Sequence, residues 1–280
     1  MRKIKFGRIL WWVCMLALLA LVLLPIIYTI SASFRTNKEI MTGQFSLIPD
    51  TISFANYKKV LIEANFARNI WNSIYYASMN TIATVIIVSM SAYVFARYEF
   101  PGKKFVFGVF ASTMFVSLGS AGLYQTMRVA NALHLNGSIN GIIVMTLFGS
   151  HITWIYIAKN FLSAVPKEID EAAKIDGAGF YQIYLRIMLP MMLPILGAVG
   201  VLTFKGTWND YLLPMLFTMT KPSQAPLAVA LQALKSSGGA AANWDLIVSG
   251  AVITMMPVII IFIVFNKLFT GGLAAGAVKG

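Results

Sequence analysis

Polar side chains interrupt one of the long apolar segments of this sequence at a regular spacing. They recur at every fourth residue and so share one face of a helix: Asn72, Tyr76, Asn80 and Thr84. Amide and hydroxyl groups surrounded by hydrocarbon must pair with one another or line a cavity. The stripe therefore indicates hydrogen bonds between helices or a path for a polar solute, and the spacing allows both. The same two interpretations apply to His151, the one histidine inside an apolar segment.

A second group of chemically distinctive residues is acidic. Of the ten acidic residues in the chain, four fall within nine consecutive positions: Glu168, Asp170, Glu171 and Asp176. Acids in a first turn stabilise the positive end of a helix dipole, so we expect a helix that begins at Pro166. Gly177 and Gly179 should end it, because glycine adopts the left-handed conformation without strain. A second short helix then leads to Pro190, where the next apolar segment begins.

Two adjacent alanines, Ala172 and Ala173, give the first of these helices a small face together with Ile169 and Asp176. Small side chains let another backbone approach closely, so this face predicts a helix end that inserts into a cleft of a partner protein. The alternative is an acidic amphipathic loop that rests on the bilayer. Anionic lipid would repel these acids, and the apolar face is too small for anchoring.

Several kinds of catalytic chemistry have no matching motif in the sequence. There is no G-x-x-x-x-G-K-[ST] phosphate-binding loop, no H-E-x-x-H metal motif and no G-x-S-x-G nucleophile elbow. Cys14 is the single cysteine, so neither an intrachain disulfide nor a cysteine metal site can form. We expect no enzyme activity, no metal and no cofactor in this chain. Because the acids lie in loops rather than in apolar segments, any transport would take its energy from another protein.

The composition is that of an integral membrane protein. Hydrophobic residues make up 58% of the chain and charged residues only 11%. The formal net charge is +12. Mean hydropathy is +0.75. Basic residues are scattered at the ends of apolar segments, which is typical of membrane topology and excludes an obvious nucleic-acid surface. The N-terminal apolar run is too long for a signal peptide and is interpreted as an uncleaved first span.

Six apolar segments are long enough to cross a bilayer. They lie at about residues 9–31, 70–95, 104–125, 139–162, 189–212 and 246–269. Most basic residues fall on the inner side when both termini are cytoplasmic. The expected fold is therefore an all-α membrane protein with six transmembrane helices. Residues 1–69 form the first transmembrane helix and a long extracellular loop, and residues 70–280 form a five-helix core that carries the acidic loop at 164–190.

The acidic segment also resembles a known family motif. Glu171-Ala172-Ala173, three residues, Gly177, nine residues and Ile187-x-Leu189-Pro190 match the EAA signature of ABC importer permeases at every spacing. The segments "ARYEFPGKK", "TWNDYLLP" and "GGLAAGAVKG" are similar to the carbohydrate-uptake branch, and to its shorter, maltose-type permease subunit. The resemblance covers about residues 65–280. It departs at Ala274, where Ser or Thr is common, and at "FNKLF" (residues 265–269).

This resemblance implies a type I ABC importer transmembrane domain whose acidic loop couples to an ATPase. The residues that it implies for coupling are Glu171, Ala172, Ala173, Asp176, Gly177, Ile187, Leu189 and Pro190. Glu171, Ala172, Ala173 and Gly177 would form the element that docks the ATPase. Ile187, Leu189 and Pro190 would join the loop rigidly to the fifth span. For the solute path we predict Tyr76, Asn80, His151 and Asn209, because aromatic faces and amide groups suit sugars.

The implied partners are a second homologous permease, an ATPase homodimer that binds ATP and Mg, and an extracellular solute-binding protein. The implied location is the bacterial cytoplasmic (inner) membrane, as a multi-pass protein. The implied function is ATP-driven import of a sugar or oligosaccharide. Alternatives are import of another polar solute, such as a polyol or glycerol phosphate, and a membrane scaffold that docks an ATPase without transport.

Overall fold

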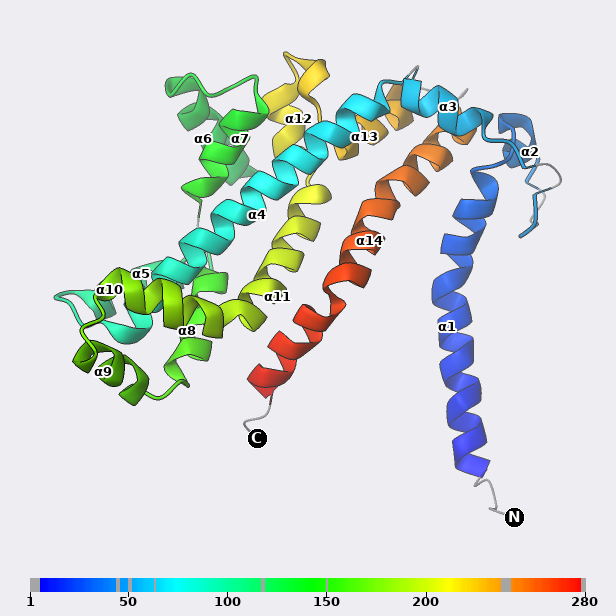
Figure 1. Cartoon of the computed structure of the whole chain (residues 1–280). Helices are drawn as coiled ribbons and strands as arrows, with labels where there is room; N and C mark the ends of the chain where they lie inside the picture. Colours follow the sequence, from blue (N-terminus) through cyan, green and yellow to red (C-terminus); the bar gives the residue numbers. More distant parts are fainter. Residues whose placement is uncertain are drawn as a thin grey trace. The chain divides into compact units, whose positions relative to one another are not determined.

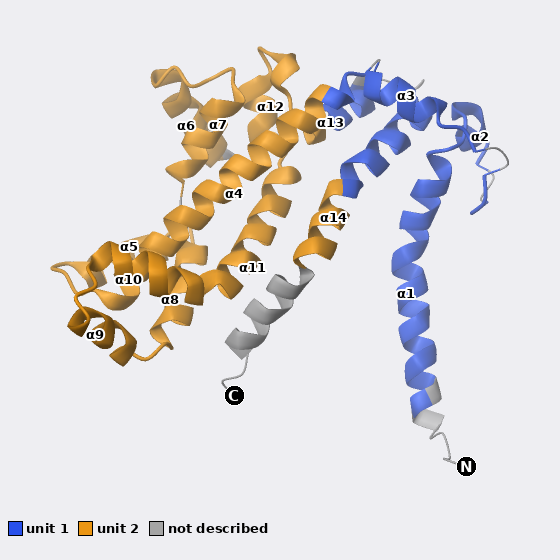
Figure 2. Cartoon of the chain, viewed as in Figure 1, with its two compact units in different colours: residues 1–67, 230–256 blue, residues 68–229, 257–280 orange. Residues whose placement is uncertain are grey.

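The computed structural model describes residues 6–43, 46–49, 52–62, 64–116, 119–149, 151–237 and 243–277. Every regular element in these ranges is a helix. The chain divides into two compact units. Unit 1 comprises Met1–Ala67 and Ala230–Met256, and unit 2 comprises Arg68–Val229 and Pro257–Gly280 (Figure 2). The helical content agrees with the all-α fold expected from the sequence.

Unit 1 is built around the chain that follows its first long helix. Its helices are α1 (Phe6–Ala32), α2 (Asn37–Met41), α3 (Ala55–Ile62) and the first part of α14 (Trp244–Ala277). The Asn56 side chain donates to the backbone carbonyls of Ser33, at 3.1 Å, and Arg35, at 2.7 Å. The Ser249 hydroxyl donates to the same Ser33 carbonyl at 3.0 Å. These buried bonds join the end of α1 to α3 and α14.

Unit 2 contains the two long helices α4 (Phe66–Arg97) and α11 (Leu189–Trp208), which lie close together where Gly200 faces Thr81 and Val85 (Figure 1). Shorter helices surround them. These are α5 (Lys103–Ser112), α6 (Gly119–Ala132), α7 (Ile139–Leu147), α8 (Ile152–Ser163), α9 (Glu168–Ile175), α10 (Phe180–Ile183), a π-helical turn (Tyr184–Met188), α12 (Leu212–Thr218) and a 3₁₀ turn (Pro222–Gln224). Helix α13 (Leu227–Ser237) belongs to unit 2 up to Val229 and to unit 1 from Ala230.

Two apolar clusters hold unit 2 together. The first joins α4, α8, α9 and α11, and its fully buried members include Val88, Leu162, Met188 and Met192. The second joins α4, α6, α7 and α12 around Tyr76, Ile142 and Phe217. Burial of a large apolar side chain contributes about 1.5–3 kcal/mol. The two clusters therefore fix α4 near both of its ends, and α4 contributes residues to both.

Four helices among the described residues are long and apolar enough to cross a membrane. They are Leu10–Ala32, Phe66–Arg97, Phe180–Trp208 and Trp244–Phe265. A fifth expected span, 139–162, is the bent pair α7 and α8, whose axes differ by 49°. His151 lies at that bend, and its Nε2 bonds the Thr146 carbonyl at 3.0 Å. The Gly149 amide bonds the same carbonyl at 3.0 Å, so the His151 ring adds a second hydrogen bond to the backbone at the bend.

The expected span at 104–125 is not one helix. α5 ends at Ser112, and α6 begins at Gly119, which has a left-handed φ of +50°. The Ser112 and Thr113 hydroxyls donate to the carbonyls of Val109 and Phe110, both at 2.7 Å. Hydroxyls that bond their own helix backbone weaken the helix locally. The sequence pattern overlooked this break because the segment is apolar on average.

Candidate functional site

The acidic helix α9 begins at Glu168, so the prediction of a start at Pro166 is wrong by two residues. The Lys167 carbonyl accepts the first helical bonds, from the amides of Asp170 at 2.9 Å and Glu171 at 3.1 Å. Lys167 is therefore the N-terminal cap, and Pro166 lies before it. The first turn carries three acids, Glu168, Asp170 and Glu171, as expected from the helix dipole.

Gly177 ends α9 in the left-handed conformation, with φ +79°. The Ala178 amide bonds the Ala173 carbonyl at 2.9 Å, and the Gly177 amide bonds the Lys174 carbonyl at 3.0 Å. This pair of bonds is a Schellman motif, which needs a residue that tolerates positive φ. No atom lies within 4 Å of the position that a Cβ on Gly177 would take. Glycine is required here by backbone conformation rather than by space.

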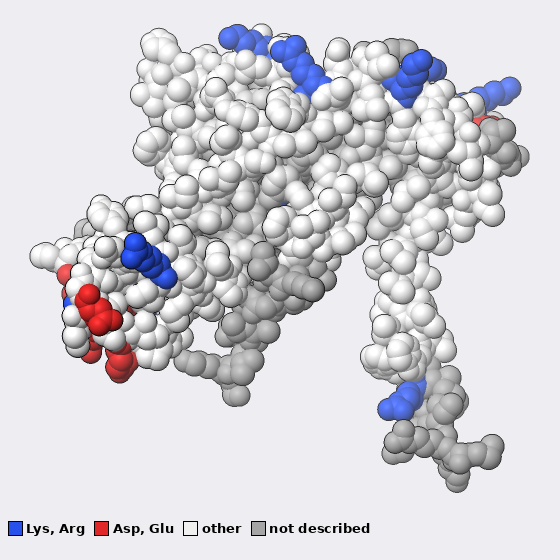
Figure 3. Space-filling view, in the orientation of Figure 1, with Lys and Arg blue, Asp and Glu red and all other residues white. Residues whose placement is uncertain are grey.

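The residues expected to dock a partner do not share one face of α9. Ala173 is only 7% exposed and packs into the first apolar cluster of its own chain. Glu171, Ala172, Asp176 and Gly177 are exposed. The expectation of a single small face made by both alanines is therefore wrong, because consecutive helical residues point about 100° apart. Figure 3 shows acidic side chains gathered where α9 lies in Figure 1.

A buried ion pair holds α9 against the end of α4. Arg97 Nε lies 2.9 Å from Asp170 Oδ2, and the two side chains are 4% and 10% exposed. Arg97 Nη1 also donates to the Val165 carbonyl at 3.0 Å, just before α9. The neighbouring pair of Glu99 and Lys103 is different, since Glu99 is largely exposed. Its hydrogen bond to Lys103 lowers the pKa of the Glu99 carboxyl, but exposed pairs contribute little stability.

The run from α10 to α11 is one continuous helical arm, Phe180–Trp208. A second helix that ends at Pro190 was predicted, but the helix passes through this proline. Pro190 has no amide hydrogen for a normal helical bond. The chain adapts with a π-helical turn in which the Leu189 amide bonds the Tyr184 carbonyl, five residues earlier. Ile187 and Leu189 pack against the first apolar cluster, so the arm is also fixed laterally.

A cavity of about 550 Å³ opens beside the polar stripe of α4. Three of the four residues predicted for a solute path line it, namely Tyr76, Asn80 and His151. Asn209 does not line the cavity. It is exposed, and its side chain donates to the Lys205 carbonyl of its own helix at 2.9 Å. The other lining residues are Thr84, Thr126, Met145, Thr146, Gly149, Trp154, Leu202, Thr203, Gly206, Thr207, Asp210 and Leu213.

Part of the stripe forms hydrogen bonds between helices. The Asn80 amide donates to Thr207 Oγ1 at 2.6 Å, and the Tyr76 hydroxyl donates to Asp210 Oδ2 at 3.1 Å. Asn72 donates to the carbonyls of Ser223 and Ala225, both at 3.1 Å. These bonds confirm the first interpretation of the stripe, which predicted hydrogen bonds between helices. Asp210 is the cavity residue that the sequence analysis missed, although it follows Asn209 directly.

Other polar atoms of the cavity residues have no partner within the described structure. They are the carbonyl oxygen of Asn80 and the hydroxyl oxygens of Thr84 and Thr203, all buried. An unpaired buried polar group costs about 1–3 kcal/mol. Water or a ligand with hydroxyl groups could supply the missing bonds. The contact with a carbonyl requires a hydrogen on His151 Nε2, and Nδ1 is then an acceptor when the ring is neutral.

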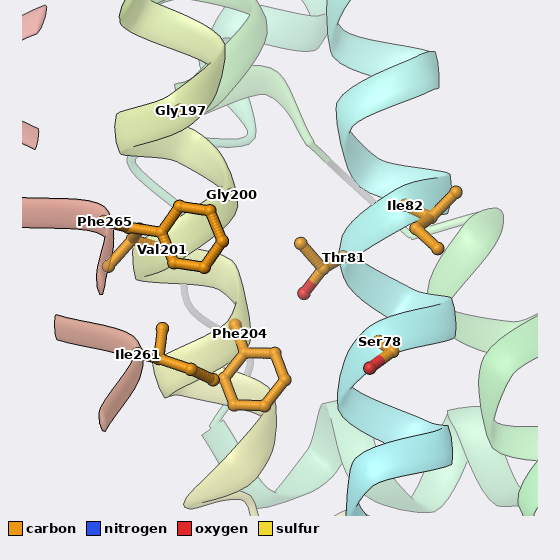
Figure 4. A pocket seen from close by; sticks show the side chains of 9 residues that line it. All are labelled: Ser78, Thr81, Ile82, Gly197, Gly200, Val201, Phe204, Ile261 and Phe265. Atoms are coloured by element: carbon orange, nitrogen blue, oxygen red, sulfur yellow. The ribbon is translucent and has the colours of Figure 1, made fainter. Parts of the chain in front are cut away.

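A second cavity, of about 390 Å³, is apolar and lies between α4, α11 and α14 (Figure 4). Its walls come from Ser78, Thr81 and Ile82, from Gly197, Gly200, Val201 and Phe204, and from Ile261 and Phe265. Figure 4 shows the Phe204 and Phe265 rings projecting from one side toward Thr81 on the other. None of the described residues that line this space is charged, and they offer little to a polar solute.

Residues 64–274 match the family of binding-protein-dependent transport system inner membrane components. The chain belongs to this family. A probable ABC transporter permease of Pyrococcus horikoshii is 31% identical over 266 residues, covering 92% of each chain. The trehalose transport system permease protein of Mycobacterium tuberculosis is 31% identical over 260 residues, covering 92% of this chain and 93% of that protein.

The fold is that of an ABC importer permease. A chain from the crystal structure of a bacterial ABC transporter that imports the acidic polysaccharide alginate superposes with a TM-score of 0.83. It is 24% identical and covers 96% of this chain and 98% of its own. Members of this family are membrane permeases rather than ATPases, in agreement with the lack of a nucleotide-binding motif. The family contains membrane components, so the multi-helix membrane assignment holds.

Proposed function

We propose that this permease forms part of an ATP-driven importer for a sugar or oligosaccharide. An extracellular binding protein would deliver the solute, and a second homologous permease would complete the translocation path. An ATPase homodimer with its ATP and Mg would dock at the loop 164–190. The proposal includes six spans, with α5 and α6 as a broken third span, both termini in the cytoplasm, and a bacterial inner membrane.

The main support for a sugar as the solute comes from the residues that line the cavity beside α4. Its unpaired oxygens on Asn80, Thr84 and Thr203 can accept hydrogen bonds from hydroxyl groups. The half-buried ring of Trp154 offers an apolar face of the kind that packs against sugar rings, whereas the Tyr76 ring is buried in the second apolar cluster. Relatives named for trehalose, diacetylchitobiose and arabinooligosaccharide transport support the same class.

The charge of the cavity favours a neutral solute over glycerol phosphate. Among the described lining residues there is one carboxylate, Asp210, and there is neither lysine nor arginine. Phosphate recognition normally uses arginine, lysine or a helix N-terminus. A sugar or a polyol therefore fits better than a sugar phosphate. The polyol remains the second candidate, because it presents the same hydroxyl groups.

The arm Phe180–Trp208 supports coupling to an ATPase. It extends from the turn at Gly177 to the cavity residues Thr203 and Thr207 without a break. The exposed Glu171 and Ala172 lie on the helix just before that turn. A push on α9 would thus pass through the short turn at Gly177 and then along the continuous arm to the cavity wall, which a scaffold without transport would not need.

Solute-stimulated ATP hydrolysis and uptake test this proposal together. The assembled complex should be reconstituted in proteoliposomes with binding protein outside and ATP inside. We expect a neutral disaccharide to be accumulated in an ATP-dependent way. ATP hydrolysis that proceeds without any uptake would support the scaffold instead. Competition by glycerol phosphate, but not by neutral oligosaccharides, would overturn the solute assignment.

A further inference from the structure

Helix α4 carries two features at well-separated positions. Asn80 and Thr84 face the cavity, and Arg97 at the C-terminal end of the helix meets α9. At about 1.5 Å per residue, Asn80 and Arg97 are roughly 25 Å apart along the axis. The helix has no proline between these positions and is continuous over Phe66–Arg97. It can therefore transmit a displacement from one position to the other as a stiff rod.

The coupling loop is attached to this rod at α9. Arg97 contributes a positive charge at the negative end of the α4 dipole, and Asp170 a negative charge at the positive end of the α9 dipole. Both charges thus suit their own helices as well as each other. The bond from Arg97 to the Val165 carbonyl fixes the chain that enters α9. A charged pair this deeply buried holds its geometry, because separation would leave two unpaired charges in the interior.

A second attachment joins α4 to α10 and the π-helical turn. The Tyr93 ring lies 5.1 Å from the Phe180 ring and 5.4 Å from the Tyr184 ring. The hydroxyls of Ser89 and Tyr184 are hydrogen-bonded at 2.7 Å. In Figure 1, α9 and α10 lie together at the end of α4. The loop is therefore held on both of its helices, and α4 is the element common to the two contacts.

We propose that Arg97 and Asp170 clamp the coupling helix α9 to α4, so that α4 and α9 move as one body. The inference rests on the proposed function of the loop. It assigns the two residues a positioning role, since neither lines the cavity nor is exposed to a partner. A displacement of α9 then reaches Asn80 and Thr84 through α4, in parallel with the arm that reaches Thr203 and Thr207. Both walls of the cavity would move together.

A reversible covalent clamp tests the inference in the assembled complex. Cys14→Ser gives a cysteine-free chain, to which Arg97→Cys and Asp170→Cys are added. A bifunctional, reductant-cleavable thiol reagent with the reach of the two original side chains then bridges them. Without the bridge we expect uptake to fall at least tenfold, and with it to return to within about twofold of the Cys14→Ser parent. Arg97→Lys should keep more uptake than Arg97→Gln, since only lysine retains the charge.

Three results would overturn the clamp. Uptake that occurs only after the bridge is cleaved would show that α9 must swing away from α4. Equal uptake with and without the bridge would show that the connection is dispensable. Loss of uptake in both forms of a complex that still assembles would show that the ion pair does something other than hold the helices together. A parent chain that takes up no solute would instead refute the proposed function.

A distance measurement tests the same inference without altering the ion pair. Spin labels are placed on exposed positions of the two helices, Met90→Cys on α4 and Glu168→Cys on α9, in the Cys14→Ser chain. The distance between the labels should be the same in nucleotide-free and ATP-bound complexes. As a control for movement, Asn80→Cys in a separate Cys14→Ser chain without the labels should give a thiol whose accessibility changes between these states. A change in the distance between the labels would contradict the clamp.

Discussion

The two functional parts of α4 differ in what their buried polar groups face. Near Arg97 the opposite charges lie 2.9 Å apart, Nη1 bonds the Val165 carbonyl and the aromatic rings are in contact, although Nε, Nη2 and Asp170 Oδ2 make no hydrogen bond among the described residues. Near Asn80 and Thr84, the buried oxygens have neither a hydrogen bond nor an opposite charge beside them among the described residues. The first part is an electrostatic joint between two helices, and the second is a set of oxygens that an additional molecule would satisfy. This difference separates the residues that position the helix from those that would contact a solute.

Removal of one charge from the joint should give the largest loss of stability. Asp170→Asn leaves Arg97 buried without its partner, at a cost of about 3–5 kcal/mol. Thermal unfolding of the purified protein measures this loss. Glu168→Gln is the matched control, because it removes an exposed acid from the same helix and should change stability by less than about 0.5 kcal/mol. Equal effects of the two substitutions would mean that the ion pair adds nothing.

A bulky residue at the turn after α9 should stop uptake with a smaller loss of stability. Gly177→Val forces a β-branched residue into φ +79°, at a cost of about 1–2 kcal/mol, and should tilt the loop. The protein should still reach the membrane, as a fractionation assay would show. Gly179→Ala is the control, since Gly179 has φ −78° and open space around it. Uptake by Gly177→Val at the wild-type rate would refute the lever role of the loop.

Two buried hydroxyls on α4 offer a direct comparison of the cavity and the joint. Thr84 and Ser89 are each 1% exposed, but Thr84 is unpaired whereas Ser89 bonds Tyr184. Thr84→Val removes one hydrogen bond to the solute, which contributes about 1 kcal/mol and corresponds to a factor of about five in binding. The KM for uptake should therefore rise about fivefold, and stability should not fall. Ser89→Ala should lower stability by about 1 kcal/mol and leave KM unchanged. A raised KM for Ser89→Ala together with an unchanged KM for Thr84→Val would show that the solute binds elsewhere.

The smallest effect is expected at Asn209. Its side chain bonds the Lys205 carbonyl and lies outside the cavity, so Asn209→Ala should leave the KM for uptake within about twofold of the wild type. Uptake kinetics over a range of solute concentrations would measure this. A large rise in KM would restore Asn209 to the solute path and would require a cavity different from the one described.

Local rules allowed much of the loop to be predicted from the sequence. The acids of the first turn, the left-handed Gly177 and the polar face of α4 follow from spacing alone. The pairing of Arg97 with Asp170 could not be predicted in that way, because it depends on how two helices distant in the sequence pack. One available signal was that both residues lie at helix ends of opposite dipole sign.

The misassignment of Asn209 has a similar cause. Asn209 and Asp210 follow the end of α11, where a change of one residue turns the side chain to another side. Helical periodicity gives no reliable direction beyond the last turn. The break between α5 and α6 was missed because average hydropathy does not detect hydroxyls that bond their own backbone. Spacing predicted the polar face of α4 and the turn at Gly177, but it predicted neither the burial of Ala173 nor the direction of Asn209.

ATP-dependent uptake in proteoliposomes is the measurement that tests the account most directly. The complex that contains this chain should accumulate a neutral oligosaccharide when ATP and the binding protein are present, and Gly177→Val should abolish the accumulation while Gly179→Ala preserves it. Accumulation that is unaffected by Gly177→Val would contradict the claim that movement of this loop opens and closes the solute cavity. ATP hydrolysis that never moves solute would contradict it as well.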